Sequence, residues 1–260
     1  MFLHQTRLLT LALLFPICTA MADQIQPSFA EPRSGKKVSS YSVDLPISRS
    51  EKKTFHIPTD CKAAVESAWF SGAQQWGGRV DRSTWWKVRR DCDYMDFLRR
   101  SPRPPEYDFV SGYDFRNAYL KDLSMRLGCG QQEESDCTTR QTGNEDITSL
   151  LPIVEQVTEN EPEVALQPCQ FENGMFRGKM LKGSSGLNCV TDPLSAGFRI
   201  IAVDYADVNG DNYQDVILRL IPIGPGLRRA PMIVPLTRME SGGPFSIPGG
   251  ITIPSRQPHR

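Results

Sequence analysis

A nine-residue acidic segment at positions 207–215 restricts the fold of this chain more than any other feature. Its oxygen-bearing side chains fall on alternate positions and then on the ninth: Asp207, Asn209, Asp211 and Asp215. The flanking segments Phe198–Tyr205 and Asp215–Ile223 are rich in β-branched and aromatic residues, which is typical of β-strands. The sequence therefore predicts a hairpin whose two strands are joined by a tight loop of oxygen donors.

This spacing suits a hard cation such as Ca²⁺, which binds roughly six to eight oxygen atoms. The expected ligands are the side chains of Asp207, Asn209, Asp211 and Asp215 and the backbone carbonyl of Tyr213. The segment resembles the D-x-[DN]-x-[DN]-x-x-x-D loops of FG-GAP repeats, related bacterial propeller blades and dockerins. The resemblance covers about nine residues and names no family for the whole chain. It implies a bound Ca²⁺ ion, which we expect to be structural because no coordination position is obviously open.

Two positions depart from the usual calcium-loop pattern. The sixth position, where glycine normally allows a sharp bend, is Asn212, and asparagine tolerates the left-handed conformation better than most residues. The twelfth position, where an EF-hand has a bidentate glutamate, is Leu218, so a helix-loop-helix sensor is not expected. The alternative is a β-turn rich in Asn and Asp that binds no metal, since these residues are ordinary turn formers.

Residues 1–22 have the pattern of a secretory signal. Arg7 provides the positive end, Leu8–Ile17 the apolar core, and Ala20-Met21-Ala22 a small-residue cleavage site. A transmembrane anchor would need about 20 apolar residues, and Pro16-Ile17 is a poor lead-in for lipid attachment at Cys18. We therefore expect an exported protein with no transmembrane anchor after cleavage, in the periplasm or outside the cell, from a bacterium.

Six cysteines follow the expected signal, and an even number in an exported chain predicts disulfides. Neighbouring cysteines are predicted to pair as Cys61–Cys92, Cys129–Cys137 and Cys169–Cys189. Zinc is a weak alternative, because the chain has no C-x-x-C pair and only three histidines. Thirty basic residues balance thirty acidic ones, so the basic footprint of a nucleic-acid-binding protein is missing.

The N-terminal half of the mature chain divides into two parts. Residues 23–57 are predicted to be an extended leader, either with one short strand at Val38–Leu45 or as a disordered linker. Residues 58–160 are predicted to be a helical domain. Its expected elements are a helix capped by Thr59 or Asp60, a second capped by Ser83, a third at Asp114–Leu127, and an apolar segment at Ile147–Val157.

Residues 161–245 are predicted to form a β-rich domain, and residues 246–260 a flexible tail. Asn173-Gly174 is a strong two-residue hairpin signal. The segment Ala230–Thr237 is expected at a sheet edge, because Pro231 and Pro235 cannot donate to a ladder. Helices followed by strands, without alternation, predict an α+β fold: a disulfide-linked helical part, then a small antiparallel β subdomain with a calcium-clipped hairpin.

Residues for catalysis are hard to identify, and we assign none. Carboxylates of the helical part could converge as a glycosidase-like pair, although a solvated helix face explains them better: Glu66, Asp91, Asp93, Asp96, Asp108 and Asp114. His56 is expected on the surface. Trp76 and Trp86 are the residues most suited to an exposed ligand-binding patch.

These observations predict an exported, disulfide-stabilised binding protein without enzymatic activity, with a structural calcium loop. Its partner would be another protein or a cell-envelope polysaccharide. Two alternatives stay open at this point: a hydrolase of envelope glycans that uses helical-part carboxylates, and an inhibitor or immunity-type protein.

Overall fold

The structure is a computed structural model that describes residues 25–48, 50–67, 79–101, 103–123, 126–127, 145–146, 153–154, 167–183, 186–224 and 231–254. The N-terminal strands are β1 (Phe29–Ala30), β2 (Lys37–Val38), β3 (Tyr41–Pro46) and β4 (Lys52–Ile57). The helices are α1 (Cys61–Val65), α3 (Arg79–Leu98) and the 3-10 turns η2 (Phe115–Asn117) and η3 (Leu120–Leu123). The remaining strands are β5 (Arg126–Leu127), β6 (Glu145–Asp146), β7 (Ile153–Val154), β8 (Gln167–Pro168), β9 (Met175–Gly183), β10 (Gly186–Thr191), β11 (Gly197–Ala206), β12 (Asp215–Ile223) and β13 (Met232–Leu236).

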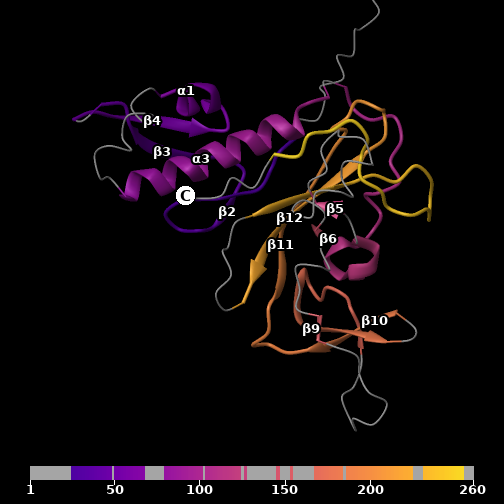
Figure 1. The fold of residues 1–260 in the computed structure, drawn as a ribbon. Coiled ribbons are helices and arrows are strands. Elements are labelled where there is room, and N and C mark those ends of the chain that lie inside the picture. Colours follow the sequence, from indigo (N-terminus) through magenta and orange to yellow (C-terminus); the bar gives the residue numbers. More distant parts are fainter. Residues whose placement is uncertain are drawn as a thin grey trace, which may run out of the picture.

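A seven-stranded sheet is the largest element of the described chain (Figure 1). Its strand order is β13-β12-β11-β9-β10-β8, with antiparallel neighbours, and β7 adds to β9 in parallel. β13 lies at the edge, as its prolines predicted. The Asn173-Gly174 hairpin turn is also confirmed: both residues have positive φ, 52° and 78°, and Glu172 bonds Met175 in both directions.

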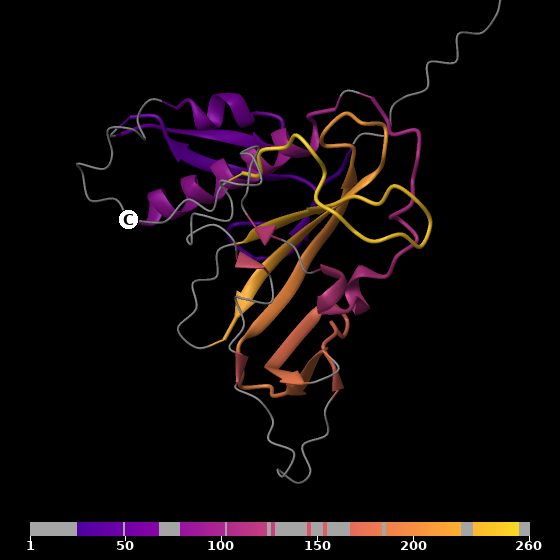
Figure 2. The same ribbon diagram turned by 45° about the vertical axis from the view of Figure 1, so that its right-hand side comes forward.

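β12 is the strand on which both hydrophobic cores are built. Its side chains alternate between the two faces of the sheet, and nearly all are buried. Val216, Leu218 and Leu220 pack into a core that the 110–123 segment covers. Ile217, on the other face, packs into a core formed by the N-terminal strands and α3. Figures 1 and 2 show these N-terminal elements gathered at one end of the sheet, away from β9 and β10.

The segment predicted to be an extended leader or a linker is folded in its described residues, and β3 overlaps the one short strand expected there, at Val38–Leu45. Residues 25–57 contain two antiparallel pairs, β1–β2 and β3–β4. In β3 Tyr41, Val43 and Leu45 face the core while Ser42 and Asp44 between them face solvent; Pro46 at the end of the strand is also buried. This period of two is the signature of a half-buried strand. The predicted flexible tail also differs, since Ile251 is buried in the same core.

Within its described residues, the part predicted to be helical contains fewer helices than expected. α3 includes the expected second helix but begins before Ser83, and a stripe of its side chains is buried: Trp85, Val88, Cys92 and Met95. The third expected helix is instead the turns η2 and η3 followed by β5. The reason is local: the Asp114 carboxylate accepts the Arg116 N–H and a side-chain N–H of Asn117, which closes a short turn rather than a helix. The described residues are mostly sheet with few helices, a composition compatible with α+β.

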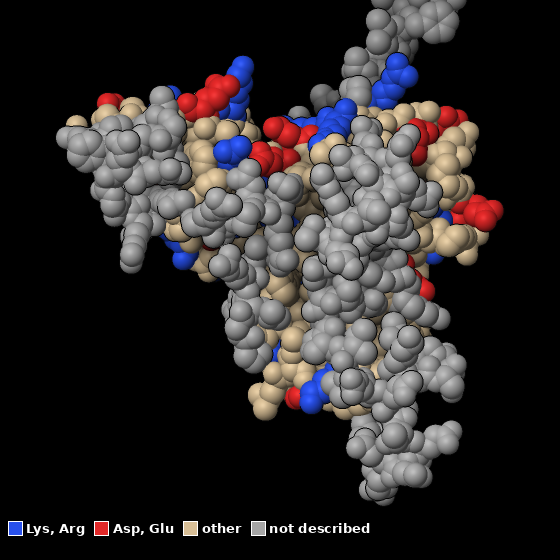
Figure 3. All heavy atoms as spheres, in the orientation of Figure 1, with Lys and Arg blue, Asp and Glu red and all other residues tan. Residues whose placement is uncertain are grey.

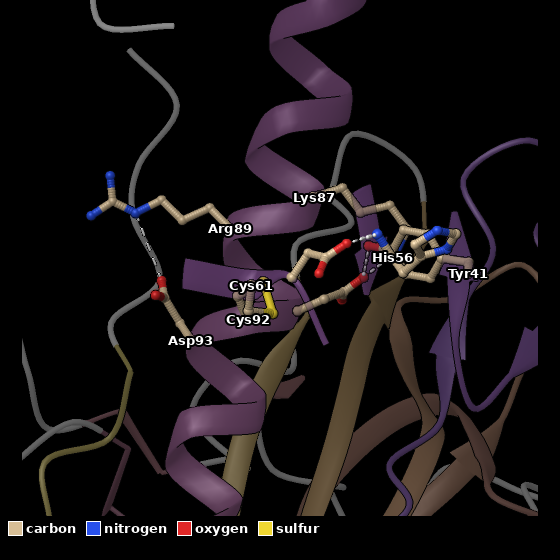
Figure 4. Close-up of a disulfide and its surroundings, with 9 residues drawn as sticks. Tyr41, His56, Cys61, Lys87, Arg89, Cys92 and Asp93 are labelled. Carbon is tan, nitrogen blue, oxygen red and sulfur yellow. Dashed lines mark hydrogen bonds and ion pairs between the residues drawn. A yellow bond between two sulfur atoms is a disulfide. The ribbon is translucent and has the colours of Figure 1, made fainter. Parts of the chain in front are cut away.

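Two of the predicted disulfides are present. Cys61–Cys92 joins α1 to α3 (Figure 4), and Cys169–Cys189 joins the segment before β9 to β10. They close loops of 31 and 20 residues. Each is expected to contribute about 2–4 kcal/mol by restricting the unfolded chain. The third predicted pair, Cys129–Cys137, lies outside the described residues.

A buried ionic cluster connects α3 to β12. The Asp91 carboxylate accepts from the Tyr41 hydroxyl at 2.7 Å, the Lys87 ammonium at 2.5 Å and the Arg219 guanidinium at 3.4 Å. Arg219 also donates to the backbone carbonyl of Ser28 at 3.0 Å and lies over the Tyr94 ring. Asp91 and Arg219 are almost fully buried. The cluster therefore joins the N-terminal strands, the long helix and the central strand of the sheet.

Replacing Asp91 with asparagine should destabilise the fold strongly. The Asp91→Asn variant keeps the side-chain shape but leaves Arg219 and Lys87 without their carboxylate, at a cost of about 3–5 kcal/mol. Asp93→Asn is the matched control on the same helix: Asp93 is half-exposed and pairs with Arg89 across 3.8 Å, on the other side of the disulfide (Figure 4). That change should cost less than about 1 kcal/mol. Urea unfolding measures both, and equal losses would contradict the role given to Asp91.

Candidate metal-binding loop

The acidic segment lies between two strands, as predicted. β11 ends at Ala206, β12 begins at Asp215, and these two residues face each other in the ladder. The loop between them is largely sheltered from solvent: Asp207 is 4% exposed and Asp215 is fully buried. Carboxylates are rarely buried this completely unless they have a compensating partner. The contacts of these two side chains are therefore the key to what the loop does.

Hydrogen bonds within the loop hold it in a tight curl. The Asp207 carboxylate accepts the N–H groups of Gly210 at 2.6 Å and Asn212 at 3.1 Å. Asp211 accepts the N–H of Tyr213 at 2.9 Å. The backbone is left-handed at Gly210, with φ 77°, and at Asn212, with φ 70°. Asn212 therefore adopts the conformation that glycine usually supplies at the sixth position of such loops.

Asp215 is the least satisfied polar group of the loop. Its Oδ2 accepts the N–H of Val208 at 2.9 Å, whereas its buried Oδ1 has no hydrogen-bond partner. The Thr237 hydroxyl lies nearby but does not reach hydrogen-bonding geometry with it. Burial raises the pKa of Asp215 to about 7; the Val208 N–H and the nearby Thr237 hydroxyl oppose this rise, and the charges of Asp211 and Asp207 add to it. A positive charge in the loop would remove this penalty.

The oxygen donors of the loop are of the chemical type that a hard cation binds. Their present orientation suits a cation less well. Among the described residues, no three or more His, Cys, Asp or Glu side chains are gathered tightly enough to hold a metal ion. Asp207 and Asp211 instead direct oxygen atoms at backbone N–H groups of the loop. A carboxylate oxygen has two lone pairs, so it can accept an N–H and also contact a cation. The remaining predicted donors are the Asn209 amide, which contacts Asp211, and the Tyr213 carbonyl.

A third segment of the chain braces the loop, and sequence reasoning did not identify it. The Asn212 carbonyl accepts the N–H groups of Glu106 at 2.8 Å and Tyr107 at 2.9 Å. The Gln214 N–H donates to the Tyr107 carbonyl at 2.7 Å, which forms a short parallel bridge between Tyr107 and Tyr213. The two segments are about a hundred residues apart in the sequence, and no periodic pattern near Glu106 marks the pairing.

The predicted tryptophan patch is not seen in the described residues. Trp76 lies outside them. Trp86 is partly buried against the N-terminal core, with its ring 5.0 Å from that of Trp85 and the Arg89 guanidinium over both rings. The exposed aromatic residue nearest the loop is instead Tyr107, which is 44% exposed.

Four of the six carboxylates considered for catalysis are held by local contacts, whereas Glu66 and Asp96 are exposed. Asp91 belongs to the buried cluster, and Asp93 pairs with Arg89. Asp108 accepts the N–H groups of Val110 and Ser111, and Asp114 closes the η2 turn. Glu66 follows the last residue of α1, and His56 is exposed on β4, where it contacts Ser42.

Charges of both signs lie side by side on the face shown in Figure 3, along the edge formed by the N-terminal elements. None of the helices in the described ranges has the length and hydrophobicity that a membrane-spanning helix requires. Comparison of the chain with protein-family models, with curated protein sequences and with solved structures found no match. The case for a function therefore depends on the loop itself.

The raised pKa of Asp215 predicts a pH-dependent stability in the presence of a chelator. Its pKa is about 7 in the folded state and about 3.9 in the unfolded chain. Between these values the folded state binds more protons, so the free energy of unfolding should fall as the pH rises from about 4 to 7. Asp215→Asn should flatten this slope, whereas the exposed control Asp44→Asn should leave it unchanged. Urea unfolding at several pH values measures the effect, and an identical slope in Asp215→Asn would contradict it.

Proposed function

We propose that this chain is an exported, disulfide-stabilised binding protein without enzymatic activity, whose β11–β12 loop holds a structural Ca²⁺ ion. The observation that carries the metal is Asp215, a fully buried carboxylate with an unpartnered oxygen in a loop of alternating oxygen donors. A buried carboxylate oxygen without a partner is costly, and a cation bound beside it would offset that cost.

The five predicted ligands supply only oxygen atoms, which Ca²⁺ prefers to nitrogen or sulfur. Asp207, Asn209, Asp211 and Asp215 would offer side-chain oxygens, and Tyr213 its backbone carbonyl. A bound ion would stabilise more than the hairpin, because the Asn212 carbonyl and Gln214 N–H also hold the 106–108 segment. In this proposal calcium fixes a junction between β11, β12 and the chain that follows α3.

Binding is favoured over hydrolysis by the contacts of the candidate carboxylates. Asp91, Asp93, Asp108 and Asp114 each accept from a neighbouring cation, backbone N–H or side chain, which leaves only Glu66, next to α1, and Asp96, in α3, of the six candidates, and both are exposed. Export is supported by the signal pattern of residues 1–22 and by two disulfides, which persist in oxidising compartments. The partner we propose is another protein or an envelope polysaccharide.

Calcium titration tests the proposal directly. Isothermal titration of the chelator-treated protein should give one saturable site, and Asp207→Asn/Asp211→Asn should abolish it. Calcium at about a hundred times its Kd should stabilise the wild type by about 2.7 kcal/mol. The melting temperature should rise accordingly in the wild type and in the control Asp44→Asn, but not in the double variant. Absence of binding heat together with an unchanged melting temperature would refute the calcium site.

A further inference from the structure

Three aromatic side chains form a partly exposed surface beside the acidic loop. The Tyr107 and Tyr213 ring centroids are 5.1 Å apart with 30° between the ring planes, and the Phe109 and Tyr213 centroids are 6.2 Å apart with 36° between the planes. Tyr107 is 44% exposed, and Phe109 and Tyr213 are half-buried. We call these three residues the aromatic face. Exposed aromatic groups that lie together mark binding surfaces more often than isolated ones do.

The two chain segments that carry the aromatic face contain acidic but no basic residues, and the arginines nearest in sequence are Arg103 and Arg116. Residues 104–115 and 207–215 include neither lysine nor arginine, which disfavours phosphate, nucleic acid and other anionic ligands. Most acidic groups nearby are already engaged: Asp108 accepts two backbone N–H groups and the Ser111 hydroxyl, and Asp207 and Asp211 accept N–H groups of the loop. The exception is the exposed Glu106 carboxylate, which lies beside the Tyr107 hydroxyl and raises the pKa of that phenol. A ligand would therefore meet ring faces, phenol groups, the exposed Asn212 side chain and one carboxylate, which can accept a hydrogen bond from a sugar hydroxyl.

We propose that the aromatic face binds a neutral glycan whose sugar rings stack on Tyr107 and Tyr213. The C–H groups on one side of a pyranose carry slight positive charge and suit the negative face of an aromatic ring, while the sugar hydroxyls can bond to amide and phenol groups. The glycan is the ligand of the binding protein proposed above. The dependence of glycan binding on calcium rests on that proposed function.

Tyr213 connects the glycan surface to the metal loop. Its N–H donates to Asp211, its backbone carbonyl is a predicted calcium ligand, and its side chain contacts Tyr107 and Phe109. Tyr107 is in turn fixed by backbone bonds to Asn212 and Gln214. A loop ordered by calcium would hold both rings in place before the ligand arrives, and such preorganisation increases affinity. Chelation should therefore weaken glycan binding without any contact between sugar and metal.

The test uses the mature protein on an array of neutral oligosaccharides that includes glucans, mannans, galactans and chito-oligosaccharides, with calcium present. Binding to at least one class is expected, and titration calorimetry with that oligosaccharide gives the affinity. Tyr107→Ala and Tyr213→Ala should each weaken binding roughly tenfold. The matched control is Tyr119→Ala, because Tyr119 is similarly exposed, at 41%, and lies between η2 and η3, where its backbone bridges Gln170. Chelator should also weaken binding in the wild type.

Several outcomes would overturn the assignment. Failure to bind any neutral oligosaccharide, or equal binding by the Tyr107→Ala and Tyr119→Ala variants, would exclude the glycan surface. Binding of poly-lysine that is lost in Tyr107→Ala would assign the face to a cationic partner instead. Because Tyr213→Ala keeps the backbone carbonyl, it should retain calcium binding, which separates the two proposals. Glycan binding without calcium binding would refute only the metal site, and calcium binding without glycan binding only the glycan surface.

Discussion

The ion pair between Arg219 and Asp91 is the contact on which the arrangement of this protein depends. β12 is buried on both faces, so a charged residue within it needs a compensating partner. Arg219 finds one in α3, and Tyr41 and Lys87 complete the coordination of the same carboxylate. The apolar face of β12 packs against the 110–123 core, while the Arg219 face is closed by the helix and the N-terminal strands.

The position of the acidic loop follows from that arrangement. Asp215 is the first residue of β12, and Val208, just before the tip of the loop, is buried in the N-terminal core. Both ends of the loop are therefore attached to rigid structure, and the 106–108 segment braces its second half. A site of this kind requires little reorganisation of the backbone when a ligand binds, which is why we place both the metal and the glycan there.

Local signals were enough to predict part of this structure. The Asn173-Gly174 turn, the strands around the acidic segment and the Cys61–Cys92 and Cys169–Cys189 pairs all depend on residues with strong local preferences. Elements fixed by distant contacts were missed. One short strand was expected at Val38–Leu45, where β3 lies, but neither its partner β4 nor the β1–β2 pair was expected. The aromatic face forms only when two segments that are remote in sequence pair. The sequence around Tyr107 or around Tyr213 alone therefore did not predict it.

The central claim is that the β11–β12 loop binds a hard cation, and terbium luminescence tests it most directly. Tb³⁺ occupies calcium sites, and its emission is sensitised by an aromatic ring close by, here Tyr213 within the loop. The account predicts green emission that saturates at one equivalent on excitation of the aromatic groups, is displaced by Ca²⁺, and is lost in Asp215→Asn. Emission that Ca²⁺ does not displace, or that persists unchanged in Asp215→Asn, would contradict it.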